Sequence, residues 1–164
     1  MKWLIYNAVF FVAYLMLMPW FVRRMLRRGG YRKGFFERIG RFPDELRAKL
    51  KARRRIWIHA VSVGEMFIAM RIARELRARN PELAFVFTVT TSTGRAVAEK
   101  QLEKDDVLLY FPVDMPWVVH RVLDAVRPLA LILVETEIWP NLLRTLNSRN
   151  IPIVLVNGRI SDRS

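Results

Sequence analysis

Short apolar runs alternate with amphipathic segments along residues 55–157. The apolar runs are rich in β-branched and aromatic residues, which is typical of buried strands, and they fall at 55–62, 83–90, 106–114, 129–136 and 151–157. The segments between them repeat apolar positions at helical spacing, and we expect helices over 65–80, 95–102, 117–126 and 138–149. The alternation predicts an α/β fold: a Rossmann-like, doubly wound parallel sheet with flanking helices, spanning residues 55–164.

Residues 3–22 form a long apolar stretch without a charged side chain. Twenty residues of helix rise about 30 Å, which is enough to cross the hydrocarbon core of a bilayer. A cleaved signal peptide is disfavoured because arginines follow at once and no small-residue cleavage site is present. An entirely apolar helix of this length would also need a larger protein around it to be buried. We therefore expect residues 1–22 to form a membrane-anchor helix, which either crosses the bilayer or lies along it.

The formal net charge of +13 is concentrated next to this stretch. Residues 23–55 contain fourteen Lys and Arg residues against three acids, whereas residues 56–164 are nearly neutral. Cations beside an apolar helix favour a membrane over a nucleic acid as partner, so we interpret 23–54 as a basic juxtamembrane segment. Its charge either fixes topology alone or also helps to present an anionic lipid substrate. The positive-inside rule predicts that residues 55–164 lie on the cytoplasmic side.

Several kinds of chemistry are disfavoured by composition. The chain has no cysteine, which excludes disulfides and thiolate metal sites, and only two histidines, His59 and His120. We expect both histidines to be structural, and we expect no metal centre and no cofactor. Neither a Walker A sequence nor a G-x-G-x-x-G motif is present, so nothing indicates nucleotide binding by these residues.

Candidate functional residues follow the predicted strands at their carboxyl ends, where open parallel sheets bind ligands. After the first strand, Gly64 is expected to allow a sharp turn that brings Glu65 to the mouth of a cleft beside Ser62. Glu65 could meet the dipole of the helix that it begins, or it could accept a proton from a hydroxyl group. Ser62 is a weak nucleophile candidate because no histidine partner or nucleophile elbow accompanies it.

Two further groups belong to the same predicted edge. Thr91, Thr93 and Gly94 follow the second strand and could hold an anion at a helix N-terminus. Glu135 and Glu137 follow the fourth strand and would point to the same side if strand geometry continued there. Arg159, after the fifth strand, is the ion-pair partner that we expect for a buried carboxylate of this pair. This group serves either as a scaffold or as a contact to substrate.

Ordered motifs along the chain resemble the N-terminal half of the 3-deoxy-D-manno-octulosonic acid (Kdo) transferases. They are YRKGFFERIGRFP, IWIHAVSVGE, TVTTSTG, FPVDMP, ILVETEIWPNLL and IPIVLVNGRISDRS. The resemblance implies a GT-B glycosyltransferase, in which an acceptor domain and a sugar-nucleotide domain face a cleft. It implies transfer of Kdo from CMP-Kdo to the lipid A precursor, lipid IVA, at the cytoplasmic face of the bacterial inner membrane.

The glutamate of the family's S-V-G-E motif, its proposed general base, falls on Glu65. Inverting transfer would follow from a single displacement. Family members are more than twice as long, so the resemblance implies that the donor domain is absent and that these residues alone are inactive. The alternative that we keep is a non-catalytic, membrane-anchored lipid-binding or assembly module.

Overall fold

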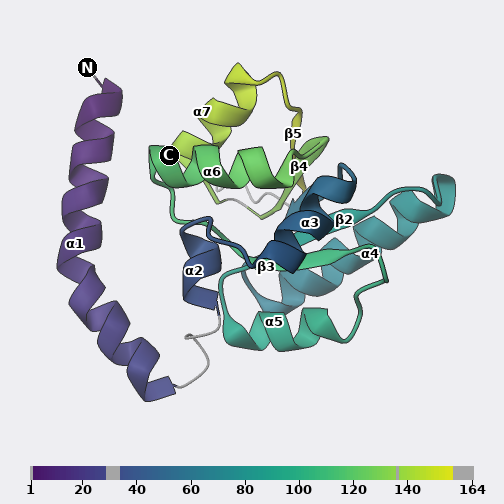
Figure 1. Ribbon diagram of the computed structural model, residues 1–164, viewed down its shortest axis with the longest axis horizontal. Helices are drawn as coiled ribbons and strands as arrows, with labels where there is room; N and C mark the ends of the chain where they lie inside the picture. The colour runs from purple at the N-terminus through teal and green to yellow at the C-terminus, as the bar shows by residue number, and fades with distance from the viewer. Residues whose placement is uncertain (1, 29–33, 136, 157–164) are drawn as a thin grey trace, which may run out of the picture. The chain divides into compact units, whose positions relative to one another are not determined.

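The computed structural model describes residues 2–28, 34–135 and 137–156. They divide into two compact units, Met1–Phe35 and Phe36–Ser164. The first unit holds helix α1 (Lys2–Arg28), and the second holds a parallel sheet with its helices (Figure 1). Residues 36–54, which we assigned to the juxtamembrane segment, belong to the same compact unit as the sheet.

The sheet confirms the predicted α/β class. Its strands are β1 (Ile56–His59), β2 (Phe85–Val89), β3 (Val107–Tyr110), β4 (Ala130–Val134) and β5 (Ile153–Val156). All neighbours pair in parallel in the order β3-β2-β1-β4-β5, which makes β1 the central strand. Because the strand order reverses beside β1, the carboxyl ends of β1, β2 and β4 form the edge at which a doubly wound sheet binds its ligands.

Helices cover both faces of the sheet (Figure 1). One face carries α4 (Val63–Arg79) and α5 (Ser92–Glu99), and the other carries α3 (Asp44–Ala52), α6 (Pro116–Val126) and α7 (Pro140–Ser148). A short helix, α2 (Phe35–Arg38), precedes α3. Helices α4 and α5 start at Val63 and Ser92, two and three residues earlier than we expected, because Ser62 and Thr91 cap them.

Burial on both faces explains why the strands are continuously apolar rather than alternating. Toward α4, Ile58, Phe85 and Phe87 pack with Met66 and Met70 in one buried cluster. The alternate positions of the strands face the other layer, where buried residues include Trp57, Leu131, Leu142 and Leu146. Each such side chain contributes about 1.5–3 kcal/mol to the stability of the fold through its removal from water. The two layers of helices therefore fix the sheet that positions the residues at its carboxyl edge.

Part of the basic segment is structural. Arg55 is buried, and its guanidinium donates to the carbonyl oxygens of Asp105 at 3.0 Å and Arg53 at 2.9 Å. Burial, and then the nearby charge of Arg53, lower the pKa of Arg55. Lys49 Nζ donates to the carbonyl of Asp106 at 2.7 Å, and Arg54 Nη2 donates to that of Pro128 at 3.1 Å. These cations therefore fix the loops that precede β3 and β4, at the amino ends of the strands.

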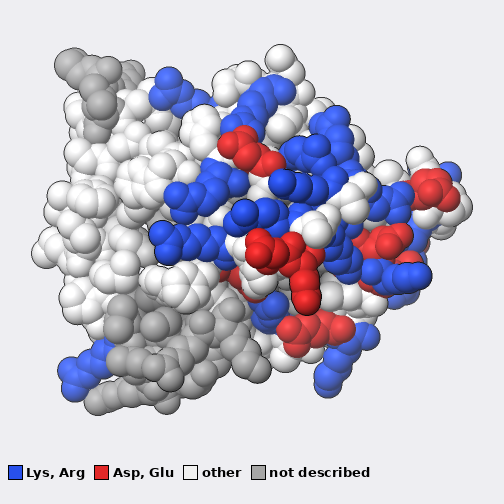
Figure 2. Space-filling view, in the orientation of Figure 1, with Lys and Arg blue, Asp and Glu red and all other residues white. Residues whose placement is uncertain are grey.

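Exposed Lys and Arg side chains also gather in one area over α3 and α6 (Figure 2). The exposed members of this area, which we call the basic face, are Arg47, Lys49, Lys51, Arg54, Arg121 and Arg127.

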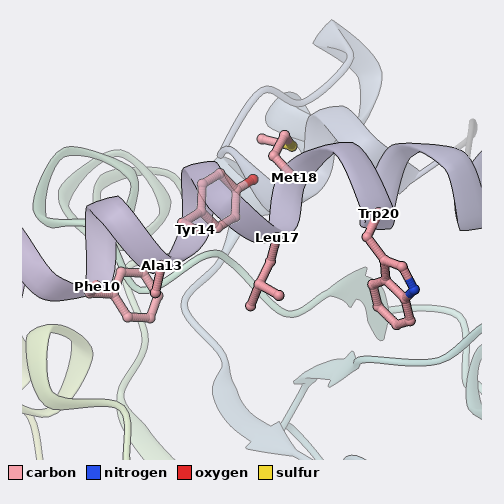
Figure 3. Close-up of a pocket in the computed structure, with 6 residues that line it drawn as sticks. All are labelled: Phe10, Ala13, Tyr14, Leu17, Met18 and Trp20. Carbon is pink, nitrogen blue, oxygen red and sulfur yellow. The ribbon is translucent and has the colours of Figure 1, made fainter.

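Helix α1 contains Pro19 and displays apolar side chains along its length. Side chains at helical spacing on one side, from Phe10 to Trp20, line a shallow apolar pocket (Figure 3). No helix in the described part of the chain is both long enough and apolar enough to span a membrane. The membrane-anchor helix that we expected at residues 1–22, whether crossing the bilayer or lying along it, is therefore not confirmed; polar Asn7 and helix-disfavouring Pro19 are the weak points of that stretch.

Candidate functional site

Ser62 and Glu65 form a capping box at the start of α4. The Ser62 Oγ accepts a hydrogen bond from the Glu65 backbone N–H at 3.2 Å, and the Glu65 carboxylate accepts from the N–H of Ser62 at 3.2 Å. A second backbone donor, the N–H of Val61, reaches Glu65 Oε2 at 2.7 Å. The Glu65 side chain is thus held at the carboxyl end of β1, where the residue is only 7% exposed.

Gly64 does not form the sharp turn that we expected, because it lies inside the first turn of α4. A Cβ built at this position would meet no atom nearer than Ser62 Oγ at 4.0 Å, so packing does not require glycine here. Gly64 and Ser62 are both exposed. Their exposure makes the backbone at the start of α4 accessible to solvent.

The loop after β2 has a structural explanation of its own. Thr91 caps α5, because its Oγ1 accepts from the Gly94 N–H at 3.1 Å. A Cβ on Gly94 would lie 3.1 Å from the same Oγ1, so this position favours glycine. Thr90 Oγ1 donates to the carbonyl of Val61 at 3.2 Å, which joins this loop to the one after β1. Thr93 is exposed beside them.

Strand geometry does not continue after β4, so the condition under which Glu135 and Glu137 would point to the same side is not met. β4 ends at Val134, and Glu135 has a left-handed backbone with φ of 72°. The chain therefore turns between the two acids, and the Glu137 N–H donates to the Glu135 carbonyl at 3.0 Å. Glu135 and Glu137 are both half-buried. Arg159, the predicted partner, lies outside the described residues.

Glu137 binds a histidine instead. His59 is the last residue of β1, is 1% exposed, and places Nε2 at 3.3 Å from Glu137 Oε2. Trp139 Nε1 donates to the same oxygen at 3.0 Å. The hydrogen bond from His59 lowers the pKa of Glu137, and the charge of His59 and the bond from Trp139 add to this effect, whereas burial opposes it. No hydrogen bond among the described residues joins Glu65 to Glu137.

A second ionic group at this edge was not predicted from the sequence. The Glu37 carboxylate, on α2, accepts from the Tyr110 N–H at 2.9 Å and from Arg95 Nη1 at 2.8 Å. The guanidinium groups of Arg38 and Arg95 lie 4.4 Å and 4.8 Å from the centre of the Tyr110 ring. Burial lowers the pKa of Arg95, but the hydrogen bond to Glu37 and the charge of Glu37 raise it by more, so the pKa of Arg95 is raised overall. The sequence feature that could have predicted this ion pair is Glu37 itself, a lone acid within the basic motif YRKGFFER.

Asp114, after β3, serves a neighbouring helix. Its carboxylate accepts from the N–H groups of Asn141 at 3.0 Å and Leu142 at 2.9 Å, in the first turn of α7. His120 is exposed, and its Nδ1 lies 3.1 Å from Arg149 Nη2. Within the described ranges, no three His, Asp or Glu side chains lie close enough together to hold a metal ion.

These features define a class of protein: a Rossmann-like α/β domain whose carboxyl edge presents carboxylates and helix N-termini. The chain belongs to the family described as 3-deoxy-D-manno-octulosonic-acid transferase (Kdo transferase), which it matches over residues 33–164. It is 38% identical over 134 residues to 3-deoxy-D-manno-octulosonic acid transferase of Haemophilus influenzae, covering 82% of this chain and 31% of that protein.

Two other relatives extend this comparison. The corresponding transferase of Bordetella pertussis is 35% identical over 155 residues, covering 88% of this chain and 34% of that protein. A bifunctional glycosyltransferase/methyltransferase of Fusobacterium nucleatum is 40% identical over 117 residues, covering 70% of this chain and 18% of that protein. The chain thus spans about a third or less of the length of these curated relatives.

Proposed function

We propose that this chain supplies the acceptor-binding part of an inverting glycosyltransferase that moves Kdo from CMP-Kdo to the lipid A precursor, lipid IVA. The observation that carries the proposal is the family match over residues 33–164, which includes the whole carboxyl edge described above. Donor binding is assigned to sequence that the longer relatives have beyond the matched region. CMP-Kdo is a substrate in this proposal, and no cofactor is invoked.

In the proposed reaction Glu65 is the general base. It takes the proton from an acceptor hydroxyl while that oxygen bonds to the anomeric carbon of Kdo, and CMP departs from the opposite face with the electrons of the broken bond. Two backbone donors occupy part of the Glu65 carboxylate, but each carboxylate oxygen has a second lone pair that can accept a hydroxyl proton. The exposure of Ser62 and Gly64 supports this role because it leaves the start of α4 accessible to an acceptor.

The other candidate residues are proposed as acceptor contacts. Ser62 and Gly64 surround the attack position, and Thr91, Thr93 and Gly94 bring the first turn of α5 to the same edge. Glu135 and Glu137 approach from the loop after β4. Arg159 keeps its predicted contact to substrate or to this pair of acids.

The experiment joins the chain to the part of the Haemophilus influenzae relative that lies beyond the matched region. We expect CMP-Kdo-dependent transfer to lipid IVA, and loss of about 10²-fold or more in turnover with Glu65→Gln, because general bases contribute roughly that much. Glu75→Gln is the matched control, since it makes the same change at an exposed position of α4. Full activity in Glu65→Gln would overturn the base assignment, and a joined protein that binds CMP-Kdo without transfer would overturn the function.

A second candidate, a non-catalytic membrane-associated lipid-binding module, is favoured by one observation. Large apolar side chains are exposed along α1, among them Val9, Val12 and Met16. We propose that α1 lies in a membrane interface, and that the protein works on the cytoplasmic side of the bacterial inner membrane. Binding to anionic vesicles with no turnover in the joined protein would select this module over the transferase.

A further inference from the structure

His59 occupies a fixed position at the carboxyl end of the central strand. Its ring stacks on Phe111 with the ring centres 3.7 Å apart, and the residue is almost completely buried. Nδ1 lies 3.0 Å from Thr88 Oγ1 and 3.2 Å from the Thr88 carbonyl oxygen on the neighbouring strand β2. Packing on one side and polar contacts on the other therefore hold the ring in a single orientation.

The surrounding hydrogen bonds determine which nitrogen of His59 donates. Trp57 Nε1 can only donate, and it does so to Thr88 Oγ1 at 2.8 Å. The Glu137 carboxylate opposite Nε2 can only accept, which places the ring hydrogen of a neutral imidazole on Nε2 and leaves Nδ1 to accept from the Thr88 hydroxyl. In a protonated ring Nδ1–H would donate to the Thr88 carbonyl instead. In both states Nε2 carries a hydrogen and donates it to Glu137 Oε2.

Glu137 is held from two sides through one oxygen. His59 Nε2 and Trp139 Nε1 both donate to Oε2, and neither of these bonds uses Oε1. The Glu137 side chain is 32% exposed, so it is accessible from solvent at the carboxyl edge. The Trp139 ring packs on Phe111 with the ring centres 4.8 Å apart, which links both donors to the same aromatic side chain.

We propose that His59 is a positioning residue for Glu137: it fixes Oε2 so that Oε1 is presented at the carboxyl edge to a hydroxyl group of a sugar acceptor. The inference rests on the proposed function for the identity of that ligand, although not for the positioning itself. Glu137 stands in a loop between β4 and α7, where a carboxylate without an anchor would sample several rotamers. A donor fixed in the core removes that freedom before the acceptor binds, which lowers the entropic cost of binding.

The test compares His59→Gln with His59→Asn in the full chain. Both substitutions remove the ring that stacks on Phe111, and the two new side chains differ by one methylene group. The terminal amide of Gln can reach the place of Nε2 and donate to Glu137, whereas the shorter Asn places its amide near Nδ1 and Thr88. The difference between the two variants therefore isolates the donor. Thermal unfolding of both variants verifies that they are folded equally.

The readouts are the carboxyl carbon resonance of Glu137, titrated with pH, and the indole N–H resonance of Trp139, assigned by Trp139→Phe. We expect the pKa of Glu137 to rise in His59→Asn and to stay near that of the native chain in His59→Gln. We also expect the Trp139 resonance to move in His59→Asn alone. Equal behaviour of the two variants, or an unchanged Glu137 pKa in both, would overturn the proposal and leave His59 a packing residue.

The variants His59→Gln and His59→Asn are also made in the protein that is joined to the Haemophilus influenzae sequence. Their kinetics test this inference separately from the proposed function. We expect His59→Asn to raise the KM for lipid IVA about tenfold, the size expected for a weakened hydrogen bond to a charged group, with a smaller change in kcat. His59→Gln should restore the KM. A Glu137 pKa difference in a joined protein that never transfers Kdo would support the positioning and reject the function. Transfer with identical KM in both variants would reject the presentation of Glu137 to the acceptor.

Discussion

Two jobs of Glu65, capping and the proposed proton transfer, can be separated at the scale of single residues. Removing the side chain with Glu65→Ala leaves the N–H groups of Val61 and Ser62 without their acceptor. We expect a loss of about 1 kcal/mol in the free energy of unfolding, the usual size for a lost helix cap, measured by urea denaturation. Glu65→Gln keeps one amide oxygen as acceptor and should lose less. Equal losses would show that the carboxylate's charge, and not its hydrogen bonding, stabilises α4.

The two glycines of the candidate edge offer a matched comparison. Gly94→Ala puts a Cβ 3.1 Å from Thr91 Oγ1, so the cap of α5 must shift and we expect destabilisation. Gly64→Ala meets open space within a helix, where alanine is favoured over glycine by roughly 0.5–1 kcal/mol. We therefore expect urea denaturation to show a more stable Gly64→Ala and a less stable Gly94→Ala.

The same comparison bears on function. Gly64→Ala should reduce transfer to lipid IVA by the joined protein despite its greater stability, because the new methyl group occupies the space above the first turn of α4. Unimpaired transfer would mean that the acceptor does not approach there.

Glu137 makes stability depend on pH in a defined direction. Its pKa in the folded chain is below the usual value of 4.5, chiefly because of the hydrogen bond from His59. A carboxyl group of this kind stabilises the fold fully above its unfolded pKa and loses that contribution as pH falls through the folded pKa. We expect the stability difference between the native chain and Glu137→Gln to be largest above pH 4.5 and to vanish at lower pH. A difference that is constant across this range would contradict the coupling.

Sequence patterns predicted the positions of these residues in the fold better than they predicted the contacts that the side chains make. Glu65, Thr91 and Glu137 were predicted at strand ends because apolar runs stop there, and a parallel sheet brings such ends together. The contact between His59 and Glu137 was not predictable, because it depends on how the loop after β4 folds back toward β1. Glu135 has a left-handed backbone conformation, which ends the strand. The prediction that Glu135 and Glu137 point to the same side depended on strand geometry at these positions.

At the scale of elements, side-chain caps explain where α4 and α5 begin. The sequence S-V-G-E is itself a capping-box signature, with serine at the cap and glutamate three residues later. Because we expected a turn from Ser62 to Gly64, the predicted start of α4 is two residues later than the observed one. The hydrophobic periodicity was enough to predict which strands exist and in what order the elements follow one another. It could not predict where α4 and α5 start, because their starts depend on these short-range hydrogen bonds.

The connection between α3 and β1 gives an element-scale prediction. Arg55 Nε and Nη1 donate to three backbone carbonyls, those of Asp105, Arg53 and Leu50, and its side chain is buried. Arg55→Ala leaves these acceptors unsatisfied and creates a cavity. We expect a loss of more than about 2 kcal/mol in the free energy of unfolding, measured by urea denaturation.

Arg54→Ala is the control for this change, since Arg54 also donates to carbonyls but is exposed. It should lose well under half as much. Similar losses would indicate that the charge of this segment, and not the burial of Arg55, stabilises the loops before β3 and β4.

At the scale of the whole molecule, the chain carries two surfaces suited to an anionic bilayer, and salt distinguishes them. If the protein binds an anionic bilayer as proposed, the basic face over α3 and α6 would attract the lipid through charges that 0.5 M salt screens (Figure 2). The exposed apolar side chains of α1 would bind by burial in the interface, which salt does not weaken. Each surface belongs to one compact unit, so each can be altered without changing the core of the other.

Flotation with vesicles that contain phosphatidylglycerol tests both surfaces. Arg47→Gln with Lys51→Gln removes two exposed cations, each worth about 1 kcal/mol near a charged leaflet, so binding at low salt should weaken about tenfold or more while binding at high salt is unchanged. Val12→Glu with Met16→Glu places charge on the exposed side of α1, where Met16 is 76% exposed, and should abolish the binding that persists at high salt. Complete release of the native chain by salt would exclude α1 as a membrane contact and leave the basic face as the sole attachment.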